Sequence, residues 1–490
     1  MDAQRAIARR MVIGLPPAGL DPAWERDFAA YPPAGVIVFR RDFADLDGLR
    51  RLTARLRELA RPRRLFIAID EEGGFVSQLA GHLAVPPNAL LLARGAAAGD
   101  IEWASRVTGE RLRSLGIDWV FAPVADVHSE PRNPVIGPRA YGSEPAHVAA
   151  RVAEALRGFR AAGLAACLKH YPGHGDTRVD SHLALPASDK PRAALEACEL
   201  VPFRGNREAA AVMTAHVVYR ALDPERPATF SRAIAHDLLR QELGFEGVCI
   251  TDSLEMKGAR EGRGAFESAR DALEAGCDLL LFALHDEELR RARLTLARAI
   301  VEGAIGREGF DASRPRLEAF DRGLAEPGGD ELARPLESLT PPDWIPRLEA
   351  IIERGLIVNG ALPAIGAPWR VVDAAPADPA RAGTRDPAPA AAALGAELAR
   401  AGVPIGEGGP ALEVAVYAGR TPLAGEPLER LRARCRERAT VLVGLQNDSF
   451  LEEIPEAALR LSAADCTPLT LRVVARTLSQ RLRAAAGARA

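Results

Sequence analysis

The densest group of chemically active side chains lies between Lys169 and His182, in the run Lys-His-Tyr-Pro-Gly-His-Gly-Asp-Thr-Arg-Val-Asp-Ser-His. These fourteen residues contain three histidines, two aspartates and a lysine. Two glycines and a proline oppose a helix here, so we expect a shaped loop that directly follows a strand. A solvated surface loop gains nothing from so many histidines, and the composition therefore favours a functional site.

Two kinds of chemistry fit this loop. Its imidazoles and carboxylates could bind a first-row metal ion, because nitrogen and oxygen ligands of these types hold such ions in proteins. The candidate ligands are His170, His174 and His182 with Asp176 or Asp180. In the alternative interpretation, Asp180 orients the imidazole of His182 and raises its basicity, so that the pair transfers protons. The second chemistry needs a nucleophile elsewhere in the chain, whereas the first does not.

Asp252 is a candidate for that nucleophile because it directly follows the apolar run 247–251. An aspartate at the end of a buried strand is partly desolvated and rigidly held, and these conditions suit a carboxylate nucleophile. The same position also suits a helix N-cap, since Asp252 and then Ser253 could cap a helix that follows. Position alone favours neither interpretation.

The elements that must position these residues are short apolar runs separated by stretches of helical periodicity. The runs are 11–15, 35–39, 65–69, 119–124, 165–168, 211–214, 247–251 and 277–282. They do not alternate cleanly between apolar and polar residues, so we expect parallel strands that are buried on both faces. Apolar residues at helical spacing lie between or after them, at 46–59, 101–115, 152–162, 231–243, 266–275 and 287–302. Eight such units in about 300 residues predict an α/β fold of the (β/α)₈ TIM-barrel type.

Polar residues at the ends of these runs favour a barrel over the alternative, a doubly wound sheet. They are Asp70, Asp126, Lys169, His170, His216 and Asp252. In a barrel the carboxyl ends of all strands converge on one face, where catalytic residues gather. In a doubly wound sheet the same residues would lie along a line, and only those near the switch point could meet.

The chain divides into two parts with a linker between them. We predict a TIM-barrel catalytic domain over 1–325, a Pro- and Gly-rich linker over 326–344 and a small α/β domain over 345–490. In the last part we expect strands at 370–372, 412–417 and 440–444, and helices at 389–401, 427–438 and 469–482. The loop between residues 374 and 389 is rich in Ala, Pro and Asp, as disordered loops are. The residues of this second domain indicate no role beyond packing or dimerisation.

Composition excludes several classes of function. The hydrophobic share of 48% over 490 residues is too high for a disordered chain, and the net charge of −3 indicates no nucleic-acid partner. We find no signal sequence and no apolar stretch of the roughly 18 residues that a membrane span needs, so we expect no membrane insertion. The six cysteines are scattered and resemble buried apolar residues in a reducing compartment. We therefore predict a cytoplasmic location; the oligomeric state stays open.

Four separated motifs make the sequence similar to a known family. They are residues 70–74 (Asp-Glu-Glu-Gly-Gly), 133–139 (Asn-Pro-Val-Ile-Gly-Pro-Arg) ahead of Tyr141-Gly142, the loop 169–182, and 252–258, with a weaker match at 212–217. On these motifs the chain resembles the family 3 glycoside hydrolases, and within them the bacterial β-N-acetylglucosaminidases of cell-wall recycling. The resemblance covers about residues 5 to 325.

The resemblance implies a retaining mechanism in two steps. Asp252 would be the nucleophile, and His182, oriented by Asp180, would be the acid and then the base. An imidazole with a pKa near about 6.5 can fill both roles at neutral pH. The residues expected to hold sugar hydroxyls are Asp70, Arg139, Lys169 and His170. The implied partner is a small carbohydrate, either a β-linked amino sugar or a muropeptide fragment, and neither a metal nor another cofactor is implied.

Other outcomes stay open beside this one. Phosphate could replace water as the acceptor, the sugar could be a different one, the loop could hold a catalytic metal, or the protein could bind sugar without catalysis. The sequence also departs from the family pattern. Where members have arginines after the glycine pair, this chain has Phe75 and Gln78, and Ser253 replaces a second aspartate. The region after residue 344 is shorter than we expect for the family's C-terminal domain.

Overall fold

The computed structural model describes residues 3–17, 19–179, 184–260, 262–284, 286–305, 307–362, 368–374, 390–406 and 412–487. Within these ranges the N-terminal part contains one parallel sheet of eight strands. The strands are β1 (Met11–Ile13), β2 (Gly35–Val38), β3 (Phe66–Ile69), β6 (Trp119–Val120), β7 (Ala165–Tyr171), β9 (Ala211–Thr214), β11 (Val248–Thr251) and β12 (Leu280–Phe282).

The order of these strands confirms the predicted barrel. Neighbours in the sheet follow the order of the chain, from β1 through β2, β3, β6, β7 and β9 to β11, and β12 pairs with β1. A parallel bridge between Ile250 and Leu279, with a 3.1 Å hydrogen bond from the Thr251 N–H to the Leu279 carbonyl, joins β11 to β12. A doubly wound sheet would instead reverse its order in the middle, so that alternative is wrong.

Alternate residues of the strands face the barrel interior. The inner cluster includes Val12, Ile37, Ala68, Phe121, Cys167, Met213, Ile250 and Leu281. Their neighbours along the same strands, such as Val36, Ile69 and Cys249, pack outward against the helices. Both sets are apolar because both faces of a barrel strand are buried, which explains why the eight runs show no alternation in the sequence.

Helices cover the outside of the barrel. They include α2 (Pro22–Ala30), α3 (Leu46–Ala60), α5 (Asp100–Ser114), α6 (Pro145–Ala161), η4 (Ala233–Glu242), α10 (Ala265–Ala275), α11 (Glu287–Val301) and α12 (Arg307–Gly323). The six predicted ones are present, and sequence reasoning missed those at 22–30 and 307–323. Several begin at aspartate caps: the Asp45 carboxylate accepts from the Gly48 N–H, and the Asp286 carboxylate from the Leu289 N–H at 2.9 Å. Among the residues that the structure describes, no helix is both long and apolar enough to cross a membrane.

The C-terminal part contains a second sheet, in the order β13-β17-β16-β15-β14. Its elements are α14 (Trp344–Gly355), β13 (Ile357–Gly360), β14 (Arg370–Asp373), α15 (Ala390–Arg400), β15 (Glu413–Tyr417), α16 (Gly425–Glu437), β16 (Thr440–Gly444), β17 (Leu459–Ser462) and α17 (Pro468–Gly487). The predicted strands and helices are present, but sequence reasoning missed β13 and β17.

The predicted linker contains two short helices, α13 (Gly329–Leu332) and η5 (Leu336–Leu339). Residues 375–389, which we expected to form a disordered loop, lie outside the described ranges.

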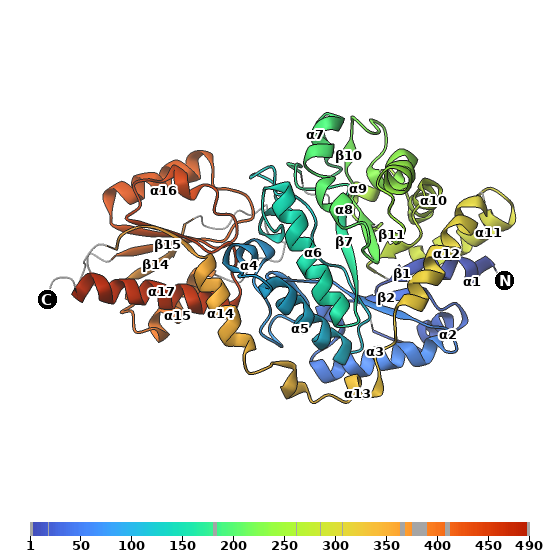
Figure 1. Cartoon of the computed structure of the whole chain (residues 1–490), viewed down its shortest axis with the longest axis horizontal. Helices are drawn as coiled ribbons and strands as arrows, with labels where there is room; N and C mark the ends of the chain where they lie inside the picture. Colours follow the sequence, from blue (N-terminus) through green and yellow to red (C-terminus); the bar gives the residue numbers. More distant parts are fainter. Residues whose placement is uncertain are drawn as a thin grey trace.

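The two parts meet along α14 and α4 (Ala89–Gly95), which lie between the barrel and the C-terminal sheet (Figure 1). Glycines allow this close approach, because a Cβ on Gly95 would lie 1.8 Å from the Ile351 carbonyl oxygen. Arg347 and Arg354 of α14 bind the two oxygens of Asp100 at 2.9 and 2.8 Å. The interface is therefore both tightly packed and charge-paired.

Candidate active site

Charged side chains from separate strand ends meet at the carboxyl face of the barrel. Asp70 follows β3, Glu72 lies in the short strand β4 (Glu71–Gly73), and Lys169 lies in β7. The Lys169 Nζ is 2.7 Å from an Asp70 oxygen and 2.6 Å from a Glu72 oxygen. Lys169 and Glu72 are almost fully buried, whereas the Asp70 side chain keeps 24% exposure. Asp70 is thus the member of this group that faces the open side.

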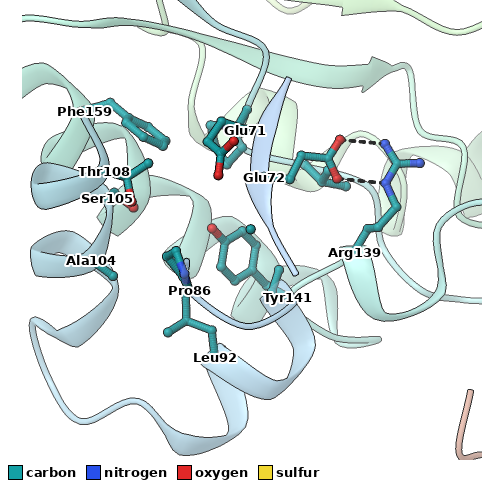
Figure 2. A pocket seen from close by; sticks show the side chains of 15 residues that line it. Glu71, Glu72, Pro86, Leu92, Ala104, Ser105, Thr108, Arg139, Tyr141 and Phe159 are labelled. Carbon is teal, nitrogen blue, oxygen red and sulfur yellow. Dashed lines mark hydrogen bonds and ion pairs between the residues drawn. The ribbon is translucent and has the colours of Figure 1, made fainter. Parts of the chain in front are cut away.

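Arg139 completes the cluster from η2 (Gly137–Arg139). Its Nε and Nη2 donate to the two oxygens of Glu72 at 2.8 and 2.7 Å, a bidentate pair that is visible in Figure 2. Its Nη2 also lies 3.4 Å from the His170 Nε2. Behind this pair lies a small hollow against α5 and α6, lined by Tyr141, Phe159 and Thr108 among others. Neither Asp70 nor Asp252 lines that hollow, so we do not assign the reaction to it.

The buried charges stabilise one another. Burial disfavours a carboxylate, but the charges of Arg139 and Lys169 outweigh it and lower the pKa of Glu72 to about 2. Burial also disfavours the Lys169 ammonium, while Asp70 and Glu72 raise its pKa to about 12. Glu72 and Lys169 therefore stay charged across the neutral range and present a fixed acceptor and a fixed donor.

His170 is held by Asp126, a buried aspartate that follows β6 in the chain. The His170 Nδ1 is 2.7 Å from one Asp126 oxygen, and the other oxygen accepts from the backbone N–H groups of His170 and His174 at 3.2 and 2.6 Å. Because a carboxylate accepts, the Nδ1–H of His170 donates to Asp126. The His170 ring is thus held in a fixed orientation.

The first part of the motif differs from our expectation of a loop. β7 continues through Lys169, His170 and Tyr171, because Lys169 and Tyr171 stay paired with Met213 and Thr214 of β9 across a register shift. The side chains of these motif residues are buried along the strand. Strand pairing with β9 extends beyond the apolar run, and the residue types alone do not reveal it.

The rest of the loop is held by side-chain contacts as far as Arg178. Burial and the neighbouring His170 lower the pKa of His174 to about 4, and its Nδ1 lies 2.8 Å from the Thr177 hydroxyl. The Asn133 amide donates to the His174 carbonyl at 2.8 Å, and Arg178 binds Glu130 at 2.7 Å. His174 is therefore neutral near pH 7 and positions the loop, so a metal site would have to displace these protein partners.

Asp180 and His182, the expected proton-transfer pair, lie outside the described residues. The neighbouring Asp176 accepts from the Ser188 hydroxyl at 2.9 Å and lies 3.1 Å from the Lys190 Nζ. Within the described ranges, no three histidine, cysteine, aspartate or glutamate side chains lie close enough to hold a metal ion together. The roles of Asp180 and His182 therefore stay predictions from the motif.

Asp252 lies at the end of β11, where its N–H donates to the Thr214 carbonyl at 3.2 Å. Its carboxylate is partly exposed and accepts from the Ser253 N–H at 2.7 Å. The next helix, α9 (Lys257–Arg260), begins five residues later, so the helix N-cap interpretation is wrong. His216, after β9, donates from Nε2 to the Ser253 carbonyl at 2.9 Å and fixes this turn.

Asp70 and Asp252 lie at the same end of the barrel. β3, β7 and β11 belong to one parallel sheet, and Asp70 and Asp252 directly follow β3 and β11 at their carboxyl ends. Both residues therefore stand on the face of the barrel where Lys169 also lies.

The two unusual positions after the glycine pair have structural partners. Gln78 is almost fully buried, and its Oε1 accepts from the Arg40 N–H at 2.9 Å, so it joins the hairpin to the end of β2. The ring of Phe75 lies under the Arg420 guanidinium of the C-terminal part, 5.2 Å from the ring centre to Cζ. A cation therefore lies beside position 75, although it comes from the other part of the chain.

Sequence reasoning assigned no role to Glu72 or Asp126, although the structure places both at the centre of the cluster. Two signals were available. Glu72 stands within the acidic motif just before Gly73 and Gly74, whose positive φ angles of 92° and 56° mark a tight hairpin turn. Asp126 follows a strand, as the expected site residues do.

Replacing Glu72 with glutamine is expected to lower the free energy of unfolding at pH 7 by about 3 kcal/mol, because Arg139 and Lys169 then share an incompletely compensated buried charge. The folded-state pKa of Glu72 lies below its ordinary 4.5, so its contribution is present above pH 4.5 and is lost as the pH falls towards about 2. Urea unfolding between pH 2 and 7 should show the difference from the wild type shrinking in that window.

The matched control is Glu102→Gln, which breaks an exposed pair with Arg157 at 2.8 Å. An exposed pair contributes about 0–1 kcal/mol, so this variant should unfold almost like the wild type. Equal losses in the two variants, or a Glu72→Gln loss that does not depend on pH, would contradict the charge assignment.

Comparisons with known proteins agree with this geometry. The model of the glycosyl hydrolase family 3 N terminal domain matches residues 24–319. The chain is 41% identical to a β-hexosaminidase of Alkalilimnicola ehrlichii over 276 residues, which cover 54% of this chain and 77% of that protein. It is 40% identical to a β-hexosaminidase of Chromobacterium violaceum over 303 residues, which cover 60% and 84% of the two chains.

A solved structure is similar over both parts of the chain. It is a glycoside hydrolase family 3 β-N-acetylglucosaminidase from Paenibacillus sp. str. FPU-7, with a TM-score of 0.87 and 30% identity. The match covers 98% of this chain and 96% of that one. The region after residue 344 therefore has a counterpart of similar size in a solved relative, which corrects our expectation of a shortened C-terminal domain.

Proposed function

Because this chain belongs to glycoside hydrolase family 3, we propose that it is a retaining β-N-acetylhexosaminidase that releases terminal β-linked N-acetylglucosamine. The observation that carries the proposal is the cluster of Asp70, Glu72, Lys169 and Arg139, whose charges are fixed at the carboxyl face of the barrel. Sugar hydroxyls are bound by such preorganised charged donors and acceptors. The names of the relatives support the choice of an amino sugar.

In the proposed first step, a carboxylate oxygen of Asp252 attacks the anomeric carbon. The glycosidic bond breaks, and His182 donates its proton to the leaving oxygen, so that a covalent glycosyl-enzyme forms. In the second step His182 takes a proton from water, the water oxygen attacks the anomeric carbon, and the Asp252 carboxylate leaves. Each step inverts the configuration at the anomeric carbon, so the product keeps the β configuration of the substrate. Asp180 orients His182 in both steps.

The remaining residues hold the sugar. Asp70 is the partly exposed acceptor, while Lys169, Arg139 and His170 stand behind it in fixed orientations. Each charge-assisted hydrogen bond to a hydroxyl is worth about 1.5–3 kcal/mol. We propose a β-linked amino sugar or a muropeptide fragment as the natural substrate and the cytoplasm as the location.

A comparison of chromogenic substrates tests the function. The wild type is expected to release the chromophore from a β-N-acetylglucosaminide much faster than from the matching β-glucoside, with the β-N-acetylgalactosaminide as a third substrate. Asp252→Ala, purified in parallel, controls for contaminating hydrolases. Turnover of the glucoside alone would contradict the sugar assignment. If no substrate is turned over, the proposed activity is wrong, and the protein would instead bind sugar without catalysis.

The reaction product shows whether water or phosphate accepts the glycosyl group. Hydrolysis predicts free N-acetylglucosamine at the same rate with and without inorganic phosphate. A sugar phosphate that forms only with phosphate present would identify a phosphorylase on the same site.

A further inference from the structure

The C-terminal part contacts the barrel at the hairpin that carries Glu72. This hairpin consists of β4 (Glu71–Gly73) and β5 (Val76–Ser77), joined through Gly74 and Phe75. Glu72 fixes both Lys169 and Arg139, so any shift of the hairpin moves the sugar-binding cluster. The contacts of Gly74 and Phe75 therefore bear directly on the site.

Asn88 connects this hairpin to the C-terminal part. It is almost fully buried and stands at the start of α4, a position where asparagine usually caps the helix. Here its side chain is used differently. The Oδ1 accepts from the Phe75 N–H at 3.2 Å, and the Nδ2 donates to the Ala464 carbonyl at 3.0 Å. One amide group thus bonds to the barrel hairpin with one atom and to the C-terminal part with the other.

The surroundings of Asn88 leave it little freedom. Its backbone N–H donates to the Asp465 carboxylate at 3.2 Å, and Asp465 is fully buried. A Cβ on Gly74 would lie 1.7 Å from the Asn88 Oδ1, so the hairpin turn is packed directly against the amide. Ala464 has a positive φ of 52°, which is unfavourable for alanine and orients the carbonyl that Asn88 uses.

A second contact from the same side reaches the same hairpin. The Arg420 guanidinium lies over the Phe75 ring, and the Asn447 Nδ2 donates both to the Arg420 carbonyl at 3.1 Å and to the Pro131 carbonyl at 3.0 Å. Pro131 adjoins Glu130, which binds Arg178 of the motif loop. The C-terminal part therefore contacts two of the segments that surround the barrel opening.

We infer that Asn88 is a positioning residue for the sugar-binding cluster, and that through it the C-terminal domain sets the affinity of the barrel for its sugar. This inference rests on the proposed function. It gives the C-terminal domain a role in the reaction although the groups that we assign to bond cleavage all lie on the barrel. Asn88 acts through Phe75 and Gly74 on Glu72, and Glu72 acts on Lys169 and Arg139.

The test compares Asn88→Ala with Arg94→Ala. Asn88 is the N-cap residue of α4, and Arg94 lies near the end of that helix. Both bind the C-terminal part: Asn88 donates to the Ala464 carbonyl, and Arg94 donates to Asp448 and Ser462 at 2.9 Å. Only the Asn88 change touches the hairpin. Asn88→Ala should raise KM and lower kcat/KM for the chromogenic N-acetylglucosaminide by about tenfold to a hundredfold, because small misplacements of binding groups have effects of this size. The kcat should change less, since Asp252 is held by other contacts.

Arg94→Ala should lower Tm like Asn88→Ala but keep KM within about twofold of the wild type. If both variants lose stability and neither changes KM, Asn88 is only a structural contact and the inference is wrong. A wild type without N-acetylhexosaminidase activity would contradict the proposed function. An active wild type with an unchanged KM in Asn88→Ala would contradict only the inference about Asn88.

A measurement on the wild type decides the matter if Asn88→Ala does not fold. Coupling between sites is reciprocal, so bound sugar should stabilise the contact with the C-terminal domain. Saturating N-acetylglucosamine is expected to slow hydrogen exchange in peptides that cover residues 71–77 and also in those that cover 460–466. Protection of the first peptides with unchanged exchange in the second would overturn the inference.

Discussion

Replacing Asp252 with alanine is expected to lower kcat on the chromogenic β-N-acetylglucosaminide by about 10⁴-fold or more, because no covalent intermediate can form without the carboxylate. The side chain is partly exposed, and its contacts include a hydrogen bond from the adjacent Ser253 N–H. The variant should therefore keep the Tm of the wild type within a few degrees and still bind N-acetylglucosamine in calorimetry.

Glu255→Gln is the matched control in the same turn. Glu255 accepts from the Leu284 N–H at 2.9 Å and from the Ser253 hydroxyl, so its replacement disturbs the turn without removing the Asp252 carboxylate. It should retain most of the activity. A fold-intact Asp252→Ala protein that keeps more than about 1% of wild-type kcat would place the nucleophile elsewhere.

Replacing His182 with alanine is expected to have the second-largest effect, and its size should depend on the leaving group. Disaccharide substrates need a proton on the leaving oxygen and should lose about 10²–10⁴-fold in kcat/KM. Aryl glycosides with acidic phenols leave with little proton assistance, so their first step should survive. The second step still lacks its base, and the glycosyl-enzyme should accumulate and give a burst of phenol.

Rescue by azide distinguishes proton transfer by His182 from a purely structural role of this residue. As an anion it attacks without deprotonation, so it should restore turnover of the activated aryl substrate by the His182→Ala variant. Asp180→Ala should give a milder form of the same pattern, because the imidazole remains but loses its orientation. An equal loss on all substrates, without burst and without azide rescue, would make His182 structural; Asp176 and His174 would then be the next candidates.

The barrel could be predicted because its strands are apolar on both faces and its polar residues stand at the strand ends. Val36 and Ile37 illustrate this, since one packs outward and the other inward. β13 and β17 lacked such a signal. β13 reads Ile-Val-Asn-Gly and is largely exposed, and β17 interrupts its two buried leucines with Arg460. Their pairing is fixed by the whole sheet and is not evident from either segment alone.

The candidate site could be predicted in part. Asp70 and Lys169 were expected together at the carboxyl face, and the structure places them 2.7 Å apart. The central role of Glu72 was not predicted, because its partner Arg139 lies 67 residues away and the motif gives no sign of the pairing. Asn88 was not predicted either, since its partners belong to two parts of the chain and its position reads as an ordinary helix cap.

The proposal of a retaining mechanism on Asp252 is tested most directly by trapping the intermediate. A fluorinated N-acetylglucosaminide with a good leaving group forms the glycosyl-enzyme faster than water can remove it. Intact-protein mass spectrometry should show one added sugar per chain, and peptide mapping should place it on Asp252, with no addition to Asp252→Ala. A sugar on another carboxylate would refute the nucleophile, and turnover that releases the α-anomer first without any adduct would refute retention itself.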